Sequence, residues 1–192
     1  MNTQIKRIFI GLSIPHEVGT RLSEISRKLK KGADKKEIDV MWSPKEKWHV
    51  TLVFIGDTPV EKVTSLEILL RDFFQNERFF EVGVRKLGAF PEIQGARFIW
   101  AGVTRTDSFV TLRQRLTAAL KPWGHLPTEL EFTPHITLGR LRNHKNITDL
   151  LSPWIRADFG KINVNEAILY ESQQIGPRTM YVPLVRYPLI SD

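Results

Sequence analysis

The chain has 192 residues, of which 42% are hydrophobic and 26% are charged. This length and composition indicate a folded protein that can bury a core as a single domain, residues 1–192, and they argue against disorder. The absence of cysteine excludes disulfides, thiolate metal sites and cysteine nucleophiles. A net charge of +7 favours polyanionic partners such as RNA, DNA or phosphorylated substrates. No apolar run approaches the ~20 residues that a membrane helix needs, so we expect no membrane partner and a cytoplasmic location.

Apolar periodicity predicts strands and helices that alternate along the chain. We expect strands at residues 6–13 and 48–56 with a helix at 16–31 between them, a helix at 60–76, strands at 79–87 and 97–103, a helix at 108–120, a strand at 134–141, a short helix at 147–154, and a closing hairpin of 162–171 with 180–187. Gly32 stands where the first helix is expected to stop, and we interpret the charged segment 30–37 as a solvated loop. Residues 122–127 contain two prolines and a glycine and predict an irregular connection.

Two segments of the chain resemble each other: WHVTLVFIG at 48–56 and PHITLGRLR at 134–142. Both contain His-(Val/Ile)-Thr-Leu, and each is followed by a segment with helical periodicity. A repeat this long indicates duplication rather than a solenoid array. The sequence therefore predicts an α+β fold of two similar lobes, each giving a strand to a shared cleft.

Strand geometry sorts the residues of the first copy between two faces. Because side chains alternate, His49 and Thr51 should point one way, while Val50, Leu52 and Phe54 point the other way, toward a core. In the second copy, the same alternation pairs His135 with Thr137 and puts Ile136 and Leu138 behind them. A polar pair built twice on an apolar strand is hard to explain by packing.

Such a set suits the opening of a cyclic phosphodiester. One histidine, with an unperturbed pKa near ~6.5, can take a proton from water while the other protonates the departing sugar oxygen. A threonine hydroxyl beside each can donate to the non-bridging oxygens. A single His-x-Thr is usually structural, and from the pattern alone the structural and functional interpretations of the pair stay open. Two histidines without acidic or cysteine neighbours make a poor zinc site, so we expect no metal. The other histidines, His16, His125 and His144, lack this context and are interpreted as surface residues.

Five segments, covering nearly the whole chain, resemble one known family. They are RIFIGLSIP, WSPKEKWHVTLVFIGD, LGAFPEIQGARFIWAGV, FTPHITLGRLR and LYESQQIGPRTMYVPLVRYPL. The chain resembles the 2H phosphoesterase superfamily and, within it, the bacterial and archaeal RNA 2′,3′-cyclic phosphodiesterases, historically called 2′-5′ RNA ligases.

The resemblance implies a bilobal fold of two antiparallel sheets with helices outside and a central cleft with pseudo-twofold symmetry. It implies that His49 is the proton donor, that His135 is the proton acceptor that activates water, and that Thr51 and Thr137 hold the phosphate. The product would carry a 2′-phosphate, and the reverse reaction would join RNA ends through a 2′-5′ bond. The implied partner is RNA with a 2′,3′-cyclic phosphate end, including tRNA fragments, bound by a monomer that uses no cofactor.

Two substrate-binding residues are less firmly indicated. The family often has an arginine five residues after the second histidine, here Arg140, which helps to bind the phosphate. Strict alternation would send Arg140 to the face opposite His135, unless a bulge or the end of the strand at Gly139 turns it back; the family often has alanine at this glycine. Arg140 could instead be an exposed charge. Phe90, on the GAFP loop, could stack on a base or anchor a buried turn.

Two other functions are compatible with the same residues. One is a phosphodiesterase that acts on a small cyclic nucleotide or on a tRNA-splicing by-product. The other is a basic RNA-binding module without catalysis. The rates on a nucleoside cyclic phosphate and on longer RNA would separate the first of these from the leading hypothesis, and tight RNA binding without cleavage would identify the second.

Overall fold

The computed structural model describes residues 4–123, 132–176 and 178–190. The described helices are α1 (His16–Lys35), α2 (Val60–Phe74), α3 (Asp107–Ala119) and α4 (Thr148–Leu151), together with 3₁₀ turns at Lys45–Lys47, Lys121–Trp123 and Ser152–Trp154. The described strands are β1 (Ile5–Ser13), β2 (Val40–Trp42), β3 (His49–Pro59), β4 (Phe80–Phe90), β5 (Ala96–Val103), β6 (His135–Lys145), β7 (Asp158–Val164), β8 (Glu166–Ile175) and β9 (Arg178–Pro188).

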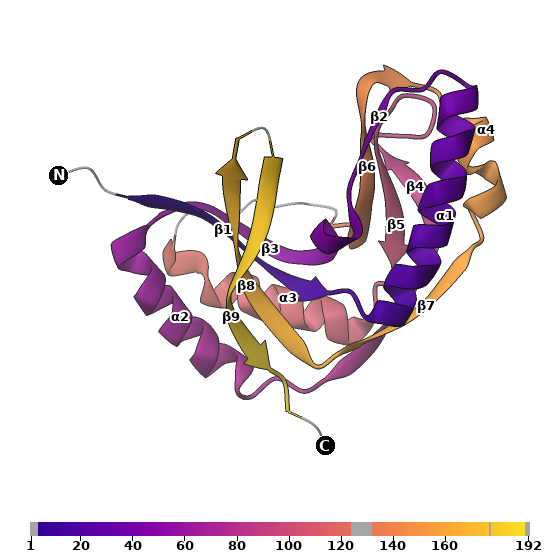
Figure 1. Ribbon diagram of the computed structural model, residues 1–192. Coiled ribbons are helices and arrows are strands. Elements are labelled where there is room, and N and C mark those ends of the chain that lie inside the picture. The colour runs from indigo at the N-terminus through magenta and orange to yellow at the C-terminus, as the bar shows by residue number, and fades with distance from the viewer. Residues whose placement is uncertain (1–3, 124–131, 177, 191–192) are drawn as a thin grey trace.

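The strands form two sheets whose pairings are all antiparallel. One sheet has the order β3-β1-β8-β9 and the other has the order β2-β6-β5-β4-β7. Figure 1 shows the two sheets side by side, with the β8–β9 hairpin and the β2–β6 pair rising on either side of the gap between them. The predicted α+β fold of two antiparallel sheets with helices outside is confirmed.

The helices cover the outer faces of the sheets. Two of them, α1 and α3, each pack against a sheet that does not contain the strand before them. The helix α1 follows β1 of the four-stranded sheet but contacts β2 and β7 of the five-stranded sheet. The helix α3 follows β5 of the five-stranded sheet and contacts both β4 of that sheet and β3 of the four-stranded sheet, beside α2 (Figure 1). Each sheet is therefore packed by a helix whose preceding strand belongs to the other sheet, which ties the two lobes together.

Amphipathic periodicity explains how these helices pack. The helix α1 buries Val18, Leu22 and Leu29, at the spacing of one helical face, against the core. The predicted stop at Gly32 is wrong, because the helix continues to Lys35. A Cβ at Gly32 would lie 2.8 Å from Leu150 Cδ1, so the glycine allows α1 to approach α4 closely instead of ending the helix. Residues 30–35 are thus helical, and the solvated loop predicted at 30–37 is wrong over that range.

Two strands were not predicted correctly. The short strand β2 was missed, and the predicted first strand of the hairpin, 162–171, combines the end of β7 with most of β8. Between Val164 and Glu166 the chain passes from the five-stranded sheet to the four-stranded sheet, so one apolar run serves two sheets. The short helix expected at 147–154 is confirmed as α4 followed by a 3₁₀ turn. Most of the connection expected at 122–127 lies outside the described residues.

Candidate active site

The two histidines begin two strands, one in each sheet: β3 is the edge strand of the four-stranded sheet, and β6 lies between β2 and β5 of the five-stranded sheet. His49 is the first residue of β3 and His135 the first residue of β6, and both are partly exposed. The next residues, Val50 and Ile136, are fully buried, and Thr51 is again partly exposed. This is the alternation that the sequence predicts, with the His and Thr side chains away from the core.

The same hydrogen bond orients both imidazole rings. Nδ1 of His49 donates to the carbonyl oxygen of Lys47 at 2.8 Å, and Nδ1 of His135 donates to the carbonyl oxygen of Thr133 at 2.8 Å. Since a carbonyl can only accept, Nδ1 carries the proton in each ring. When either imidazole is neutral, its Nε2 therefore holds a lone pair that can take a proton, and when it is charged, its Nε2 can give one.

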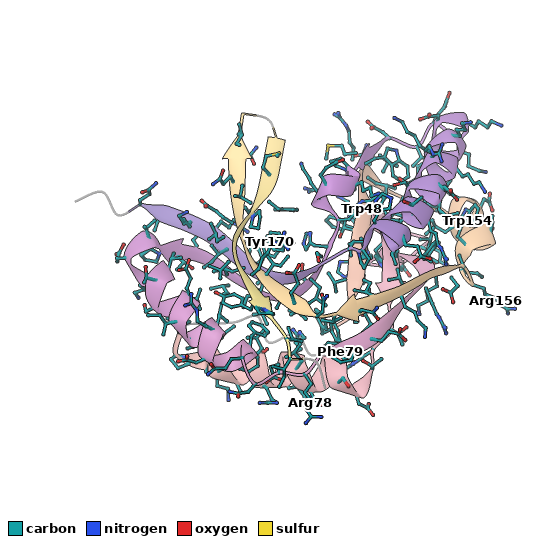
Figure 2. All side chains as sticks on the ribbon, turned by 60° about the horizontal axis from the view of Figure 1, so that its bottom comes forward. Trp48, Arg78, Phe79, Trp154, Arg156 and Tyr170 are labelled. Atoms are coloured by element: carbon teal, nitrogen blue, oxygen red, sulfur yellow. The ribbon has the colours of Figure 1, made fainter. Side chains whose placement is uncertain are left out.

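Aromatic rings surround His49. The ring of Phe9 lies 4.8 Å from the His49 ring between centroids, and the ring of Tyr181 meets it edge-on at 4.9 Å and 81°. Tyr170 lies 6.2 Å away. Figure 2 shows Tyr170 on the β8–β9 hairpin and Trp48, the residue before His49, on the side of the five-stranded sheet. These contacts desolvate His49 on the side of the four-stranded sheet.

His135 has a matching aromatic contact from other strands. Phe90, the last residue of β4, meets the His135 ring edge-on at 5.0 Å and 79°, and Trp100 of β5 lies 6.3 Å away. Phe90 also packs against Trp100 at 5.2 Å. The predicted loop position of Phe90 is wrong, because β4 extends through this residue, and its ring contacts the histidine.

The surroundings of His49 lower its pKa. Burial lowers its pKa from the ordinary value of 6.5, the hydrogen bond to the Lys47 carbonyl raises it, and the charge of His135 lowers it further. The last effect requires the two histidines to be close enough for one charge to act on the other. His49 is therefore mainly neutral near neutral pH in the free protein.

A cleft of about 380 Å³ opens beside His49 and is lined from both sheets. Its described lining residues are Arg7, Phe9, Ser43, Lys47, His49, Thr51, Phe54, Phe98, Thr137, Ser172 and Tyr181. Two of these side chains are cationic and, within the described lining, none is acidic. The structure therefore brings Thr51 and Thr137, from strands far apart in the sequence, to one cavity with His49.

A β-bulge follows each His-x-Thr pair. In the β1–β3 ladder Gly11 pairs with Thr51 and Ile10 with Val53, which leaves Leu52 as the extra residue of β3. Such a bulge reverses the alternation beyond it. The prediction that Phe54 points into the core is therefore wrong, because its ring lines the cleft.

The second motif has its bulge at the equivalent position. Trp100 pairs with Thr137 and Ile99 with Gly139, so Leu138 is the extra residue of β6. Arg140 then pairs with Phe98, and directly paired residues share a face of the sheet.

Phe98 lines the cleft, and its ring centroid lies 5.5 Å from Arg140 Cζ. Arg140 thus lies on the cleft face of β6, and the bulge considered in the sequence analysis is present.

The structure also brings residues to the cleft that the sequence analysis did not name. Arg7 and Phe9 of β1, Phe98 of β5 and Tyr181 of β9 reach it through strand pairing. Knowledge of the register would have identified Phe9 and Phe98, since each pairs with the residue five positions after a histidine. Nothing in the local sequence identifies Tyr181.

Two of the remaining histidines, His16 and His144, are not among the described residues that line the cleft. His16 and His144 are exposed, as predicted, whereas His125 lies outside the described residues. Across residues 4–123, 132–176 and 178–190, no three His, Asp or Glu side chains are grouped as a metal ion would need. No helix in the same part of the chain is long and apolar enough to cross a membrane.

Sequence comparison identifies relatives over nearly the whole chain. A model of the 2′-5′ RNA ligase superfamily matches residues 18–174. The RNA 2′,3′-cyclic phosphodiesterase of Methanothermobacter thermautotrophicus is 28% identical over 170 residues, which are 87% of this chain and 90% of the relative. The protein of the same name from Thermotoga maritima is 29% identical over 168 residues, 85% of this chain and 87% of the relative.

Solved structures share the fold. TT0787 of Thermus thermophilus superposes with a TM-score of 0.79 at 25% identity and covers 95% of this chain and 97% of its own. Escherichia coli LigT, solved in complex with 3′-AMP, has a TM-score of 0.73 at 23% identity and covers 97% of this chain and 99% of its own. The second likeness is one of fold alone.

Proposed function

Because the chain belongs to the 2′-5′ RNA ligase superfamily, we propose that it hydrolyses the 2′,3′-cyclic phosphate at the end of an RNA, with His49 and His135 as acid and base. The RNA 2′,3′-cyclic phosphodiesterases among its relatives support this reaction. The observation that carries it is the matched pair of imidazoles, each held through Nδ1 by a backbone carbonyl so that Nε2 is available for proton transfer.

The chemistry requires one proton to be taken and one to be given. His135 Nε2 takes a proton from water as the water oxygen attacks phosphorus, and the bond between phosphorus and the 3′-oxygen breaks on the opposite side. His49, in the charged form that a bound anionic phosphate favours, donates its Nε2 proton to that departing oxygen. The phosphate stays on the 2′-oxygen, so the product is a 2′-phosphomonoester. A 5′-hydroxyl in place of water would join two RNA ends through a 2′-5′ bond.

The other cleft residues suit the charge that develops on the phosphate. The hydroxyls of Thr51 and Thr137, which line the cleft from the two sheets, would donate to the non-bridging oxygens. Arg140, on the same face of β6 as Thr137, would pair with them as a guanidinium. The aromatic lining and the cation Lys47 fit a nucleotide, whose base is flat and apolar and whose phosphate is anionic.

Phe90 has another role in this proposal. Its edge-on contact with His135 supports a part in holding the histidine ring, rather than the base-stacking role considered in the sequence analysis.

We expect the protein to act as a monomer in the cytoplasm and to need no metal, because the two histidines perform both proton transfers.

Turnover of an oligonucleotide with a 2′,3′-cyclic phosphate end, measured in EDTA, tests this function. His49→Ala and His135→Ala should each lower kcat by about 10²- to 10⁴-fold, the usual contribution of a positioned acid or base. His144→Ala is the matched control, because His144 is exposed and bonds a carbonyl, that of Gly95 at 2.9 Å, outside the cleft lining. Circular dichroism checks that each variant is folded.

Mapping of the product tests the assignment of the leaving group. A 2′-phosphate is expected, and a 3′-phosphate would exclude the 3′-oxygen as the leaving group. Undiminished turnover in either histidine variant, or strict dependence on added metal, would contradict the mechanism. RNA binding without any opening of the cyclic end would favour a non-catalytic RNA-binding module.

A further inference from the structure

Arg7 is a cation of the cleft that the proposed chemistry does not use. It lies on β1, and its side chain lines the same cavity as His49 and Thr51. Its guanidinium carbon lies 5.0 Å from the centroid of the Phe54 ring. This cation–π contact holds the charged group at the Phe54 side of the cleft and leaves N–H groups at its edge able to donate to a ligand.

The register of β1 places Arg7 away from the reacting end. Gly11 pairs with Thr51, whereas Phe9 pairs with Phe54 and Arg7 with Asp57. Arg7 lies four positions before Gly11 on the strand, so their Cα atoms are about 13 Å apart at about 3.3 Å per residue. An aromatic section of the cleft therefore lies between the threonine and the guanidinium.

The charge of Arg7 is available for a ligand. Its ion pair with Asp57 has a nitrogen–oxygen distance of 3.8 Å, and the two side chains are 57% and 67% exposed. An exposed pair at this distance contributes little and exchanges readily for a better partner. A phosphodiester oxygen that accepts a charge-assisted hydrogen bond is such a partner.

The order of groups along the cleft matches the order of groups at an RNA end. The His/Thr pairs would hold the cyclic phosphate, and the aromatic section would hold the terminal nucleoside. The next group upstream in an RNA is the phosphodiester that joins this nucleoside to the rest of the chain. In a nucleoside 2′,3′-cyclic monophosphate, that position carries only a hydroxyl.

We propose that Arg7 binds the phosphodiester immediately upstream of the terminal nucleotide, and so makes the protein prefer an oligonucleotide with a cyclic end to a nucleoside 2′,3′-cyclic monophosphate. The inference rests on the proposed function of the cleft. It identifies a second anion subsite and decides between the two enzymatic alternatives.

Two substrates that differ by one upstream nucleotide, and so by its phosphodiester, test this subsite. They are uridine 2′,3′-cyclic monophosphate and the dinucleotide UpU with a 2′,3′-cyclic end. For the unmodified protein, kcat/KM should be about tenfold or more higher on the dinucleotide, which is the range of one charged hydrogen bond. Arg7→Gln should lose most of that advantage through KM and should leave the mononucleotide rate unchanged.

Two further measurements separate charge from contact area. A dinucleotide with a neutral methylphosphonate linkage should be cleaved equally by the unmodified protein and by Arg7→Gln. The slope of log(kcat/KM) against log[salt] on the natural dinucleotide should become shallower by about 0.7 in the variant, the amount expected for one contact to a single strand. Arg85→Gln is the matched control, because Arg85 is 63% exposed and paired with Asp158 at 3.2 Å outside the cleft lining.

The possible outcomes distinguish the inference from the proposed function. If both substrates are hydrolysed but the unmodified protein shows no preference, or Arg7→Gln loses rate equally on both, the upstream subsite is wrong and the hydrolytic function stands. If neither substrate is hydrolysed by the unmodified protein, the proposed function fails and the subsite fails with it.

Discussion

The strands β3 and β6 carry the same motif but place it in different surroundings. Each begins with a histidine whose Nδ1 donates to the carbonyl two residues earlier, at 2.8 Å in both cases. Each has a bulge at the leucine three positions later, Leu52 or Leu138. The duplicated feature is therefore a backbone arrangement. Its hydrogen bond fixes the tautomer of the histidine ring, and its bulge returns the fifth residue after the histidine to the cleft.

The residues that the two bulges turn toward the cleft are not duplicated. Five positions after the histidine, β3 has Phe54 and β6 has Arg140. A ring on one side and a guanidinium on the other suit a ligand with a flat apolar end and an anionic end. The two lobes therefore share a backbone geometry and present different side chains to the cleft.

The aromatic contacts differ in the same way. An edge-on ring meets each histidine at nearly the same distance and angle, but it is Tyr181 of β9 for His49 and Phe90 of β4 for His135. His49 has Phe9 at 4.8 Å as a second close ring, whereas the second ring of His135, Trp100, lies at 6.3 Å. The lobes therefore offer two imidazoles with the same orientation and different degrees of packing.

The largest expected effect tests whether this asymmetry separates acid from base. Replacing the 3′-oxygen of the cyclic phosphate by sulfur gives a leaving group that needs no proton, since thiols ionise near ~8.5 and ribose hydroxyls only at much higher pH. His49→Ala should recover most of its about 10²- to 10⁴-fold loss on this substrate, and His135→Ala should recover little. Single-turnover rates on the oxygen and sulfur substrates measure both losses.

Reversed recovery would exchange the two roles while keeping the paired-histidine chemistry. Equal recovery in both variants would mean that neither histidine acts specifically on the leaving group. His144→Ala should show the same ratio of sulfur to oxygen rates as the unmodified protein, since His144 is exposed outside the cleft lining.

An intermediate effect concerns the edge-on rings. Tyr181→Leu and Phe90→Leu should each lower kcat about two- to tenfold, the range that corresponds to losing one aromatic pair contact. Phe90→Leu should do so with little change in KM, whereas Tyr181→Leu should also raise KM, because Tyr181 lines the cleft. Tyr181→Phe and Phe90→Tyr keep the ring and should restore the rate. If Tyr181→Phe is as slow as Tyr181→Leu, the hydroxyl rather than the ring is important. Tyr181 and Phe90 would then not have equivalent roles in the two lobes.

The sequence predicted the parts of this site that depend on local pattern. The two His-x-Thr pairs, the buried residues between them and the apolar faces of the helices follow from strand and helix periodicity. Phe54 was assigned to the wrong face, because the bulge at Leu52 arises from pairing with β1, and no local pattern records that register. The role of Gly32 within α1 likewise depends on Leu150, which is far away in the chain.

The contacts that β8 and β9 make could not be predicted from the sequence. Tyr181 reaches His49 only because β8 pairs with β1 and β9 with β8. The apolar run that contains β7 and β8 gives no sign that its halves belong to different sheets. Strand partners are set by the packing of the whole molecule, so residues that reach the cleft through them could not be named in advance.

The smallest expected effect is the titration of His49. Its pKa in the folded protein lies below 6.5 because of burial and the charge of His135, whereas the unfolded chain has no such burial. The unfolded state therefore binds more protons below about pH 6.5, so stability falls as pH decreases from about 6.5 through the folded pKa of His49 and this contribution then levels off. His49→Gln should flatten the pH dependence of the denaturation midpoint in that window.

Side-chain NMR of the histidines measures the same shift directly and relates it to catalysis. His135→Gln removes one charge that lowers the pKa of His49, so that pKa should rise toward 6.5, and His144→Gln should leave it unchanged. An unchanged pKa in His135→Gln would mean that the charge of His135 does not act on His49. A bound anionic phosphate should raise the pKa of His49 again. If His49 is the proton donor, the alkaline limb of kcat should therefore lie at higher pH than that of kcat/KM, which means that the substrate itself helps to keep the acid protonated.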